Sequence, residues 1–170
     1  MAAATGISLE EYLHTDYEPD VDYVDGEIEE RYVGEYDHGF VQGELYALLR
    51  VLRKRLGWYP AIEQRLQVTP ERCRVPDVCV SLDKPSEQVF TRPPFLCVEI
   101  LSPEDRMSRM EKKIRDYFTF GVKYVWVIDP QERRGWVYTG AESREALDGV
   151  LRTTDPEIAV ALADILPITE

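Results

Sequence analysis

The stretch of sequence that decides the fold is VPDVCVS, residues 75–81. A second stretch of the same kind, FLCVEIL, follows at residues 95–101. Both are short and apolar, as buried strands are, and each contains one acid, Asp77 in the first and Glu99 in the second. An ionised carboxylate is expensive to bury unless it is paired or binds a metal. Two successive strands that each carry one acid therefore indicate a functional site.

The two acids are expected to meet if these strands pair. Side chains alternate between the faces of a strand, so Asp77 shares a face with Cys79, and Glu99 with Cys97. One register of the pair places the carboxylates side by side, where they stay ionised together only with a cation between them. Oxygen ligands without thiolates favour Mg²⁺ or Mn²⁺. Such an ion suits phosphodiester hydrolysis, because it lowers the pKa of an attacking water.

A purely structural explanation of the same acids also fits their spacing. In that interpretation Asp77 is a turn residue after Pro76, and Glu99 is a strand-end acid that caps the following helix. The spacing alone leaves both interpretations open.

A first long helix is predicted from about His38 to Leu56, before Gly57. Its apolar residues recur with the period of a helix and form one stripe. The stripe consists of Val41, Leu45, Leu48, Leu49, Leu52 and Leu56. His38 falls within this stripe at the start of the helix, where it is either a satisfied core or capping residue, or a metal ligand or proton shuttle.

A second long helix is predicted from Ser102, as N-cap, to about Phe120. Pro103 at the first helical position and the acid at the third support this start. Lys113 lies on the flank of the inward face of this helix, whereas Lys112 points to the opposite side. A lysine near the acids would orient the attacking water and offset charge on the phosphate. The prediction for that role is Lys113.

The other predicted elements complete one domain, residues 1–170, of the α/β class with a mixed sheet. Residues 1–37 form an acidic N-terminal extension, with a short helix from Ser8 to Leu13 and a hairpin at Asp25-Gly26 whose acids should mostly face water. Further strands are predicted at residues 61–68, 122–129 and 135–138, and an apolar closing segment at 158–166.

The net charge does not exclude a nucleic-acid partner. Residues 1–37 hold twelve acids and one base, Arg31, so they carry −11 of the formal charge of −12. The remaining residues are nearly neutral and contain two basic clusters, at residues 50–55 and 106–115. Such clusters are more often solvated helix faces than nucleic-acid footprints. The charge therefore neither supports nor excludes a nucleic-acid partner.

The cysteines and the hydropathy indicate a cytoplasmic protein. Cys73, Cys79 and Cys97 form no CxxC pair, and two of them lie in apolar strands, as small buried residues do in a reducing compartment. A zinc site is not expected. The start of the chain lacks the pattern of a signal peptide, and no stretch approaches the ~20 apolar residues of a membrane span. We therefore expect no membrane partner.

Three segments of the chain resemble the Uma2 family of restriction-endonuclease-like proteins, within the PD-(D/E)xK nuclease superfamily. They are Pro76-Asp77, VEILSP at residues 98–103, and the pattern from Lys113 through Tyr117 and Gly121 to Pro130. The resemblance covers about residues 8–166. It implies a restriction-endonuclease-like core, a mixed sheet flanked by helices, with N-terminal hairpin additions. It also implies an endonuclease that hydrolyses DNA with Mg²⁺ or Mn²⁺.

The resemblance also assigns roles to individual residues. Asp77 and Glu99 would be metal ligands, with the backbone carbonyl of Ile100 as a third. The usual lysine of the superfamily lies two residues after the second acid, where this chain has Leu101, and Lys113 on the helix would substitute for it. His38 would reach the metal through water.

An alternative function stays open beside this one. The chain could keep the nuclease fold without catalysis and bind a partner as an accessory subunit, since it has no separate DNA-reading module. A homodimer is also plausible, in which the acidic N-terminal region packs against a basic surface of a second copy.

Overall fold

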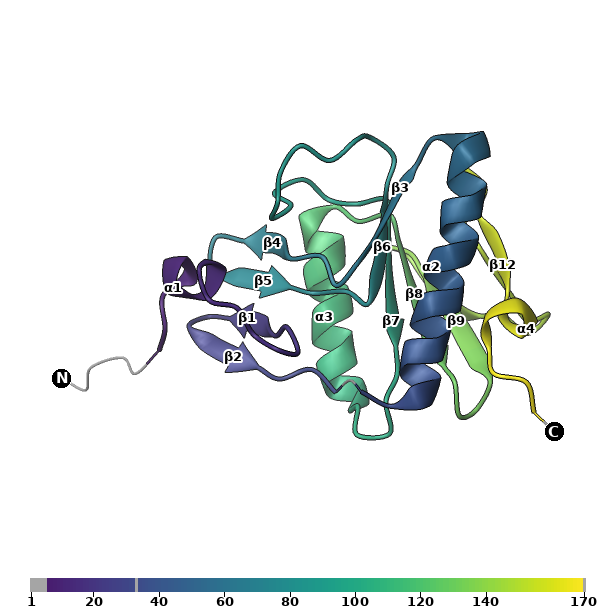
Figure 1. Ribbon diagram of the computed structural model, residues 1–170, viewed down its shortest axis with the longest axis horizontal. Coiled ribbons are helices and arrows are strands. Elements are labelled where there is room, and N and C mark those ends of the chain that lie inside the picture. The colour runs from purple at the N-terminus through teal and green to yellow at the C-terminus, as the bar shows by residue number, and fades with distance from the viewer. Residues whose placement is uncertain (1–5, 33, 170) are drawn as a thin grey trace.

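The two predicted strands pair with each other at the centre of the molecule. The computed structural model describes residues 6–32 and 34–169. In it β6 (Val78–Ser81) and β7 (Leu96–Ile100) pair antiparallel within a six-stranded sheet of order β10-β9-β8-β7-β6-β3 (Figure 1). β7 and β8 are parallel and the other pairs antiparallel, so the sheet is mixed, as predicted. The other strands are β3 (Tyr59–Ile62), β8 (Tyr124–Asp129), β9 (Arg134–Tyr138) and β10 (Ser143–Glu145).

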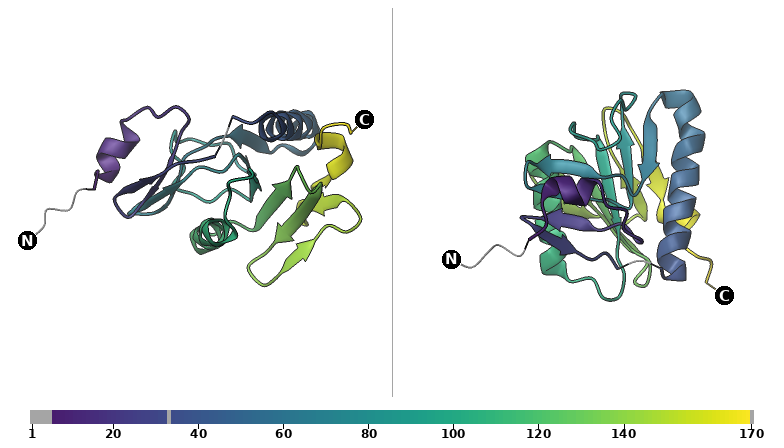
Figure 2. Two further views of the ribbon diagram at one scale, coloured as in Figure 1. Left: turned by 90° about the horizontal axis from the view of Figure 1, so that it is seen from below. Right: turned by 60° about the vertical axis from the view of Figure 1, so that its left-hand side comes forward.

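Two helices cover the two faces of this sheet, α2 (Tyr36–Leu56) on one and α3 (Met107–Phe120) on the other (Figure 2). The core on the α2 side contains Val41, Leu45, Leu49, Val78, Val80 and Val98, and the core on the α3 side contains Cys79, Cys97, Met110, Ile114 and Tyr117. The side chains of β6 and β7 thus alternate between the faces as predicted. By the same alternation Asp77 and Glu99 belong to the face that α3 covers.

A second, smaller sheet stands beside the first and carries the N-terminal part of the chain (Figure 1). Its order is β2-β1-β5-β4, with β1 (Asp22–Val24), β2 (Glu27–Glu29), β4 (Leu66–Thr69) and β5 (Arg72–Arg74). The predicted hairpin turn is present, with positive φ at Asp25 and Gly26. The predicted short helix is α1 (Leu9–Leu13), and Ser8 Oγ accepts a hydrogen bond from the N–H of Glu11. We call residues 6–32 the N-terminal unit.

The C-terminal part of the chain closes the core on the α2 side. β11 (Val150–Arg152) and β12 (Ala159–Ala161) form a hairpin, and α4 (Leu162–Ile165) follows it and packs near α2 (Figure 1). The predicted apolar closing segment at 158–166 thus supplies a strand and a short helix to the core.

The prediction of a single strand at residues 61–68 is wrong, because two separate strands cover this region. The extended conformation is interrupted at Glu63, whose φ of 47° lies in the left-handed region that non-glycine residues rarely adopt. The N–H of Glu63 donates to the carbonyl of Asp77 at 3.2 Å, which holds this turn in place. As a result β3 joins the large sheet and β4 joins the small one.

The predicted start of the second helix is also wrong. α3 begins at Met107, because residues 102–105 form a turn in which the N–H of Ser102 donates to Asp105 Oδ2 at 2.7 Å. Ser102 Oγ donates instead to the carbonyl of Tyr32 at 2.9 Å, so it is not available as an N-cap. The first helix begins two residues before His38, at Tyr36.

The acids of the N-terminal unit do not all face water. Asp22 is fully buried, with Oδ2 3.1 Å from Arg74 Nη1 and Oδ1 2.8 Å from the N–H of Val75. Asp20 pairs with Arg65 at 2.8 Å. The arginines that bind these acids belong to the same chain, so this contact requires no second copy. A homodimer stays a prediction.

Two further predictions concern the cysteines and the membrane. All three cysteines are free and buried, as expected of small apolar residues. Across residues 6–32 and 34–169, no helix combines the length and the apolar character that crossing a bilayer needs.

The burial of Asp22 leads to a stability prediction. We expect Asp22→Ala to lower the free energy of unfolding by at least about 2 kcal/mol, because it leaves the buried N–H of Val75 without its acceptor and removes one of the three carboxylates around Arg74. The control is Asp25→Asn in the same hairpin, a change that the positive φ of this turn residue tolerates. Its partner Arg72 is only partly buried, so the loss of this ion pair should cost at most about 1 kcal/mol. Urea denaturation of both variants measures the difference. Equal losses would contradict the prediction.

Candidate active site

Asp77 and Glu99 lie opposite each other at one end of the β6–β7 pair. The register pairs Val78 with Val98, and its continuation by one pair brings Asp77 opposite Glu99. Both side chains are buried, with 3% of each residue exposed. The backbone of Asp77 is fixed by Gln42, whose Nε2 donates to the Asp77 carbonyl at 2.9 Å. The structure thus brings the two predicted acids together in the register that the sequence analysis required.

The carboxylate of Asp77 is surrounded by donors. Oδ1 lies 2.6 Å from Arg31 Nη2 and 3.3 Å from His38 Nε2, and Oδ2 accepts the N–H of Ile100 at 2.7 Å. Burial alone would raise the pKa of Asp77, but the hydrogen bond from His38 and the charge of Arg31 outweigh burial and lower this pKa to about 2. Asp77 is therefore an anion over the whole physiological pH range.

Glu99 has the opposite electrostatic character. Its Oε2 lies 2.8 Å from Lys113 Nζ, and its Oε1 accepts the O–H of Tyr117 at 2.5 Å. Burial raises the pKa of Glu99, and repulsion from Asp77 adds to it, so that the pKa is about 7 despite the nearby lysine. Burial likewise raises the pKa of Tyr117, which keeps its hydroxyl protonated as a donor. Glu99 thus changes charge close to neutral pH.

Lys113 points into the site and Lys112 points away from it, as the helical spacing predicted. Lys113 is buried and Lys112 exposed. Burial acts to lower the pKa of Lys113, but the carboxylates of Asp22, at 3.5 Å, and Glu99 outweigh it and raise the pKa. The lysine is therefore a cation held between an acid of the small sheet and an acid of the large one.

His38 is buried at the start of α2 and faces Asp77 rather than open solvent. Burial acts to lower its pKa, but the hydrogen bond to Asp77 outweighs burial and raises it. The structure therefore places all four predicted site residues, Asp77, Glu99, Lys113 and His38, around one small pocket.

Three residues of the site were missed by the sequence analysis. Tyr117 lies one helical turn after Lys113, and this spacing was the signal that could have found it. Arg31 and Asp22 come from the N-terminal unit. Their approach to the site depends on how the two sheets dock, and no periodicity in the sequence encodes that docking.

The oxygen atoms at the site suit a hard divalent cation, but the chain offers only a few of them as ligands. Among residues 6–32 and 34–169, no group of three His, Cys, Asp or Glu side chains is arranged to hold a metal. Two carboxylates and a backbone carbonyl still fit Mg²⁺, which proteins often bind through one or two carboxylates together with water and substrate phosphates. The pocket between these residues has a volume of about 20 Å³, enough for one water-sized particle.

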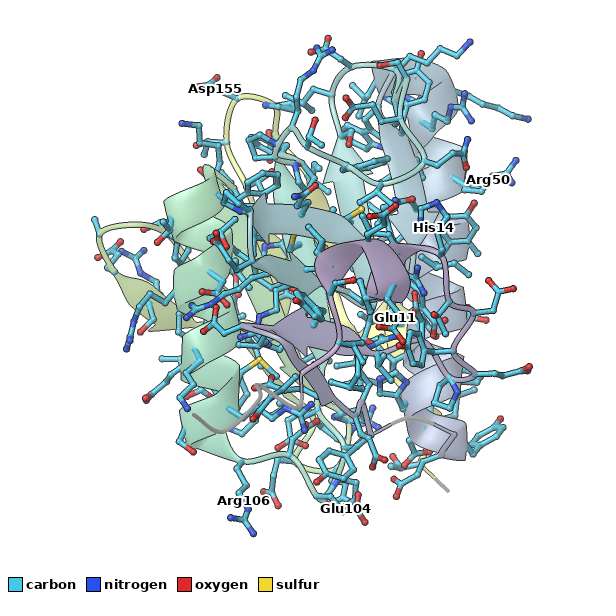
Figure 3. All side chains as sticks on the ribbon, turned by 90° about the vertical axis from the view of Figure 1, so that its left-hand side faces the viewer. Glu11, His14, Arg50, Glu104, Arg106 and Asp155 are labelled. Atoms are coloured by element: carbon cyan, nitrogen blue, oxygen red, sulfur yellow. The ribbon has the colours of Figure 1, made fainter. Side chains whose placement is uncertain are left out.

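A larger cavity of about 370 Å³ lies at the opposite end of the sheet. It is lined by the loop after β6, by Pro93 and Pro94, and by Asp155, which Figure 3 shows at the far end of the molecule from Glu104 and the start of α3. None of the four predicted residues lines it. Its three basic and three acidic side chains balance, so their charge selects no ligand.

Comparison with known proteins agrees with this geometry. A family model described as "Uma2: Putative restriction endonuclease" matches residues 9–165. This chain belongs to the Uma2 family. The resemblance to Uma2 is thus confirmed, and with it the predicted mixed α/β fold with a restriction-endonuclease-like core.

A solved structure has the same fold as this Uma2 protein. It is described as a putative nuclease belonging to DUF820, from Anabaena variabilis. The TM-score is 0.79 and the sequence identity 23%, over 94% of this chain and 97% of that one. No curated protein matches this sequence.

The raised pKa of Glu99 predicts how stability depends on pH. The folded state holds this proton more tightly than the unfolded state, whose pKa is near 4.5. The protonated carboxyl group therefore makes its full contribution to the free energy of unfolding below about pH 4.5, and this contribution is lost as the pH rises to about 7. Glu99→Gln stays neutral at every pH. Its free energy of unfolding should therefore rise by about 3 kcal/mol relative to that of wild type across that interval, at about 1.4 kcal/mol per pKa unit.

Denaturation of both proteins at several pH values between 4.5 and 8 measures this difference. A difference that does not change with pH would show that Glu99 titrates normally.

Proposed function

We propose that this protein is an endonuclease that hydrolyses phosphodiester bonds of DNA with Mg²⁺ or Mn²⁺. The observation that carries the proposal is the pair of buried acids, Asp77 and Glu99, opposite each other with Lys113 Nζ 2.8 Å from Glu99. Two buried acids side by side destabilise a fold unless cations or hydrogen-bond donors offset their charge, which is an arrangement typical of a metal site. The description of the family supports a nuclease in general.

The proposed division of roles follows from the contacts. Asp77 and Glu99, with the backbone carbonyl of Ile100, would hold the cation. When bound, the cation supplies Lewis acidity and lowers the pKa of a water molecule. His38, already directed at Asp77, would contact the cation or its water.

Lys113 would orient the attacking water and offset negative charge on the phosphate. Its ammonium is fixed by Glu99 on one side and Asp22 on the other, so little reorganisation is needed during the reaction. The position of the usual lysine of the superfamily is taken by Leu101, which has no charge to contribute.

A second candidate function is a catalytically silent protein that binds a partner. It is favoured by one observation: each oxygen of the two carboxylates already has a donor from the chain itself. In this case the charges would stabilise one another and no cation would bind through both Asp77 and Glu99.

The nuclease proposal predicts a matched pair of lysine variants. Lys113→Met should lose about 100-fold or more of the cleavage rate, since it removes a preorganised cation from the reacting phosphate. Lys112→Met, the exposed neighbour on the same helix, should cleave like wild type. Asp77→Asn should be inactive. Cleavage of supercoiled, linear and single-stranded DNA with Mg²⁺ and with Mn²⁺ measures all four proteins.

Two outcomes would separate the candidates. If wild type cleaves none of these substrates above the level of Asp77→Asn, the protein is not a DNA endonuclease under these conditions and the proposal fails. If Mn²⁺ titration also shows no affinity that depends on both Asp77 and Glu99, the silent protein is the correct alternative.

A further inference from the structure

Arg31 places a positive charge where a cation would bind. It follows β2, and its side chain is 4% exposed. Nη2 is 2.6 Å from Asp77 Oδ1, and Nη1 is 3.9 Å from Glu63 Oε1, too far for a hydrogen bond. Nη1 is buried, and among residues 6–32 and 34–169 no atom accepts a hydrogen bond from it. The guanidinium is thus close to the acids of the site and binds Asp77 through Nη2.

The contact with Asp77 conflicts with cation binding at the same oxygen. Oδ1 of Asp77 already has two neighbouring donors, Arg31 and His38, and a carboxylate oxygen has about two lone pairs. A Mg²⁺ ion bound to it at about 2.1 Å would lie within about 5 Å of Arg31 Nη2, which is 2.6 Å from the same oxygen. Two positive charges so close to each other repel strongly. Arg31 and the cation therefore cannot both bind Oδ1 without electrostatic repulsion between them.

We propose that Arg31 is a built-in cation that a divalent metal ion must displace from Asp77. This inference rests on the metal site of the proposed function. Arg31 is a positioning residue: it keeps Asp77 ionised and in place in the metal-free protein, and it weakens metal binding.

The displacement couples the metal site to the N-terminal unit. Glu30 to Tyr32 lie outside the strands, between β2 and α2, where the chain can shift without breaking a sheet. This segment also contacts the α3 side of the site, because Arg109 donates to the carbonyl of Glu30 and Ser102 to that of Tyr32. Metal binding should therefore move Arg31 together with these neighbours.

Calorimetric titration of the metal-free protein with Mn²⁺ tests the proposal. Arg31→Gln should bind Mn²⁺ about ten-fold or more tightly than wild type, since a hydrogen bond to a charged group no longer has to be broken. The matched control is Arg65→Gln, which loses the same charge. Arg65 also connects the N-terminal unit to the core, through its ion pair with Asp20, but it does not contact Asp77. Its Mn²⁺ affinity should equal that of wild type.

The direction of the change excludes a merely structural effect, because a damaged site loses affinity. Unchanged or weaker Mn²⁺ binding by Arg31→Gln overturns the proposal, as does an equal gain in Arg65→Gln or the absence of Mn²⁺ binding to wild type and Arg31→Gln alike. DNA cleavage plays no part in the measurement. An inactive protein whose Arg31→Gln variant binds Mn²⁺ more tightly would refute the nuclease function and leave this inference standing.

A second measurement uses wild type alone and applies even if Arg31→Gln does not fold. The ¹⁵N–¹H signal of Arg31 Nε should shift on saturation with Mg²⁺, whereas the corresponding signal of Arg65 should not. An unchanged Arg31 signal at saturating Mg²⁺ overturns the proposal.

Discussion

The structure depends on the burial of two carboxylates, Asp77 and Glu99, opposite each other between two packed layers. Each charge would be costly there without partners. The partners come from three directions: Lys113 from α3, His38 from α2, and Arg31 from the N-terminal unit. The arrangement of the helices and of the small sheet around β6 and β7 is therefore also the arrangement that neutralises this pair.

The same cluster continues into the small sheet. Asp22 faces Lys113 and Arg74, and Arg74 Nε lies 2.7 Å from Asp116 Oδ2 on α3. A buried ionic network of this kind is weak evidence for stability, because desolvation offsets much of the Coulomb attraction. It defines instead how the N-terminal unit, β5 and α3 are placed relative to one another. Removing any one charge leaves each of its neighbours with one partner fewer.

The two acids differ in a way that suits a site more than a core. Asp77 is held ionised with a pKa of about 2, whereas Glu99 has a pKa of about 7. Two carboxyl groups in one site whose pKa values are pushed apart have separate roles in many enzymes. Here the difference arises from the donors: a guanidinium and an imidazole on Asp77, against a lysine that Glu99 shares with Asp22.

Local patterns in the sequence determined the strands around Asp77 and Glu99, the alternation of their faces and the inward direction of Lys113. These follow from periods of two and of about 3.6 residues, which every strand and helix obeys. The break at Glu63 and the late start of α3 were decided by contacts with Asp77, Tyr32 and Asp105, which no local pattern contains. Only the tertiary structure brought Arg31 and Asp22 to the site. Their distances from Asp77 and Lys113 depend on the docking of two sheets, and a charged residue in or after a hairpin carries no local sign of the partner that it will meet.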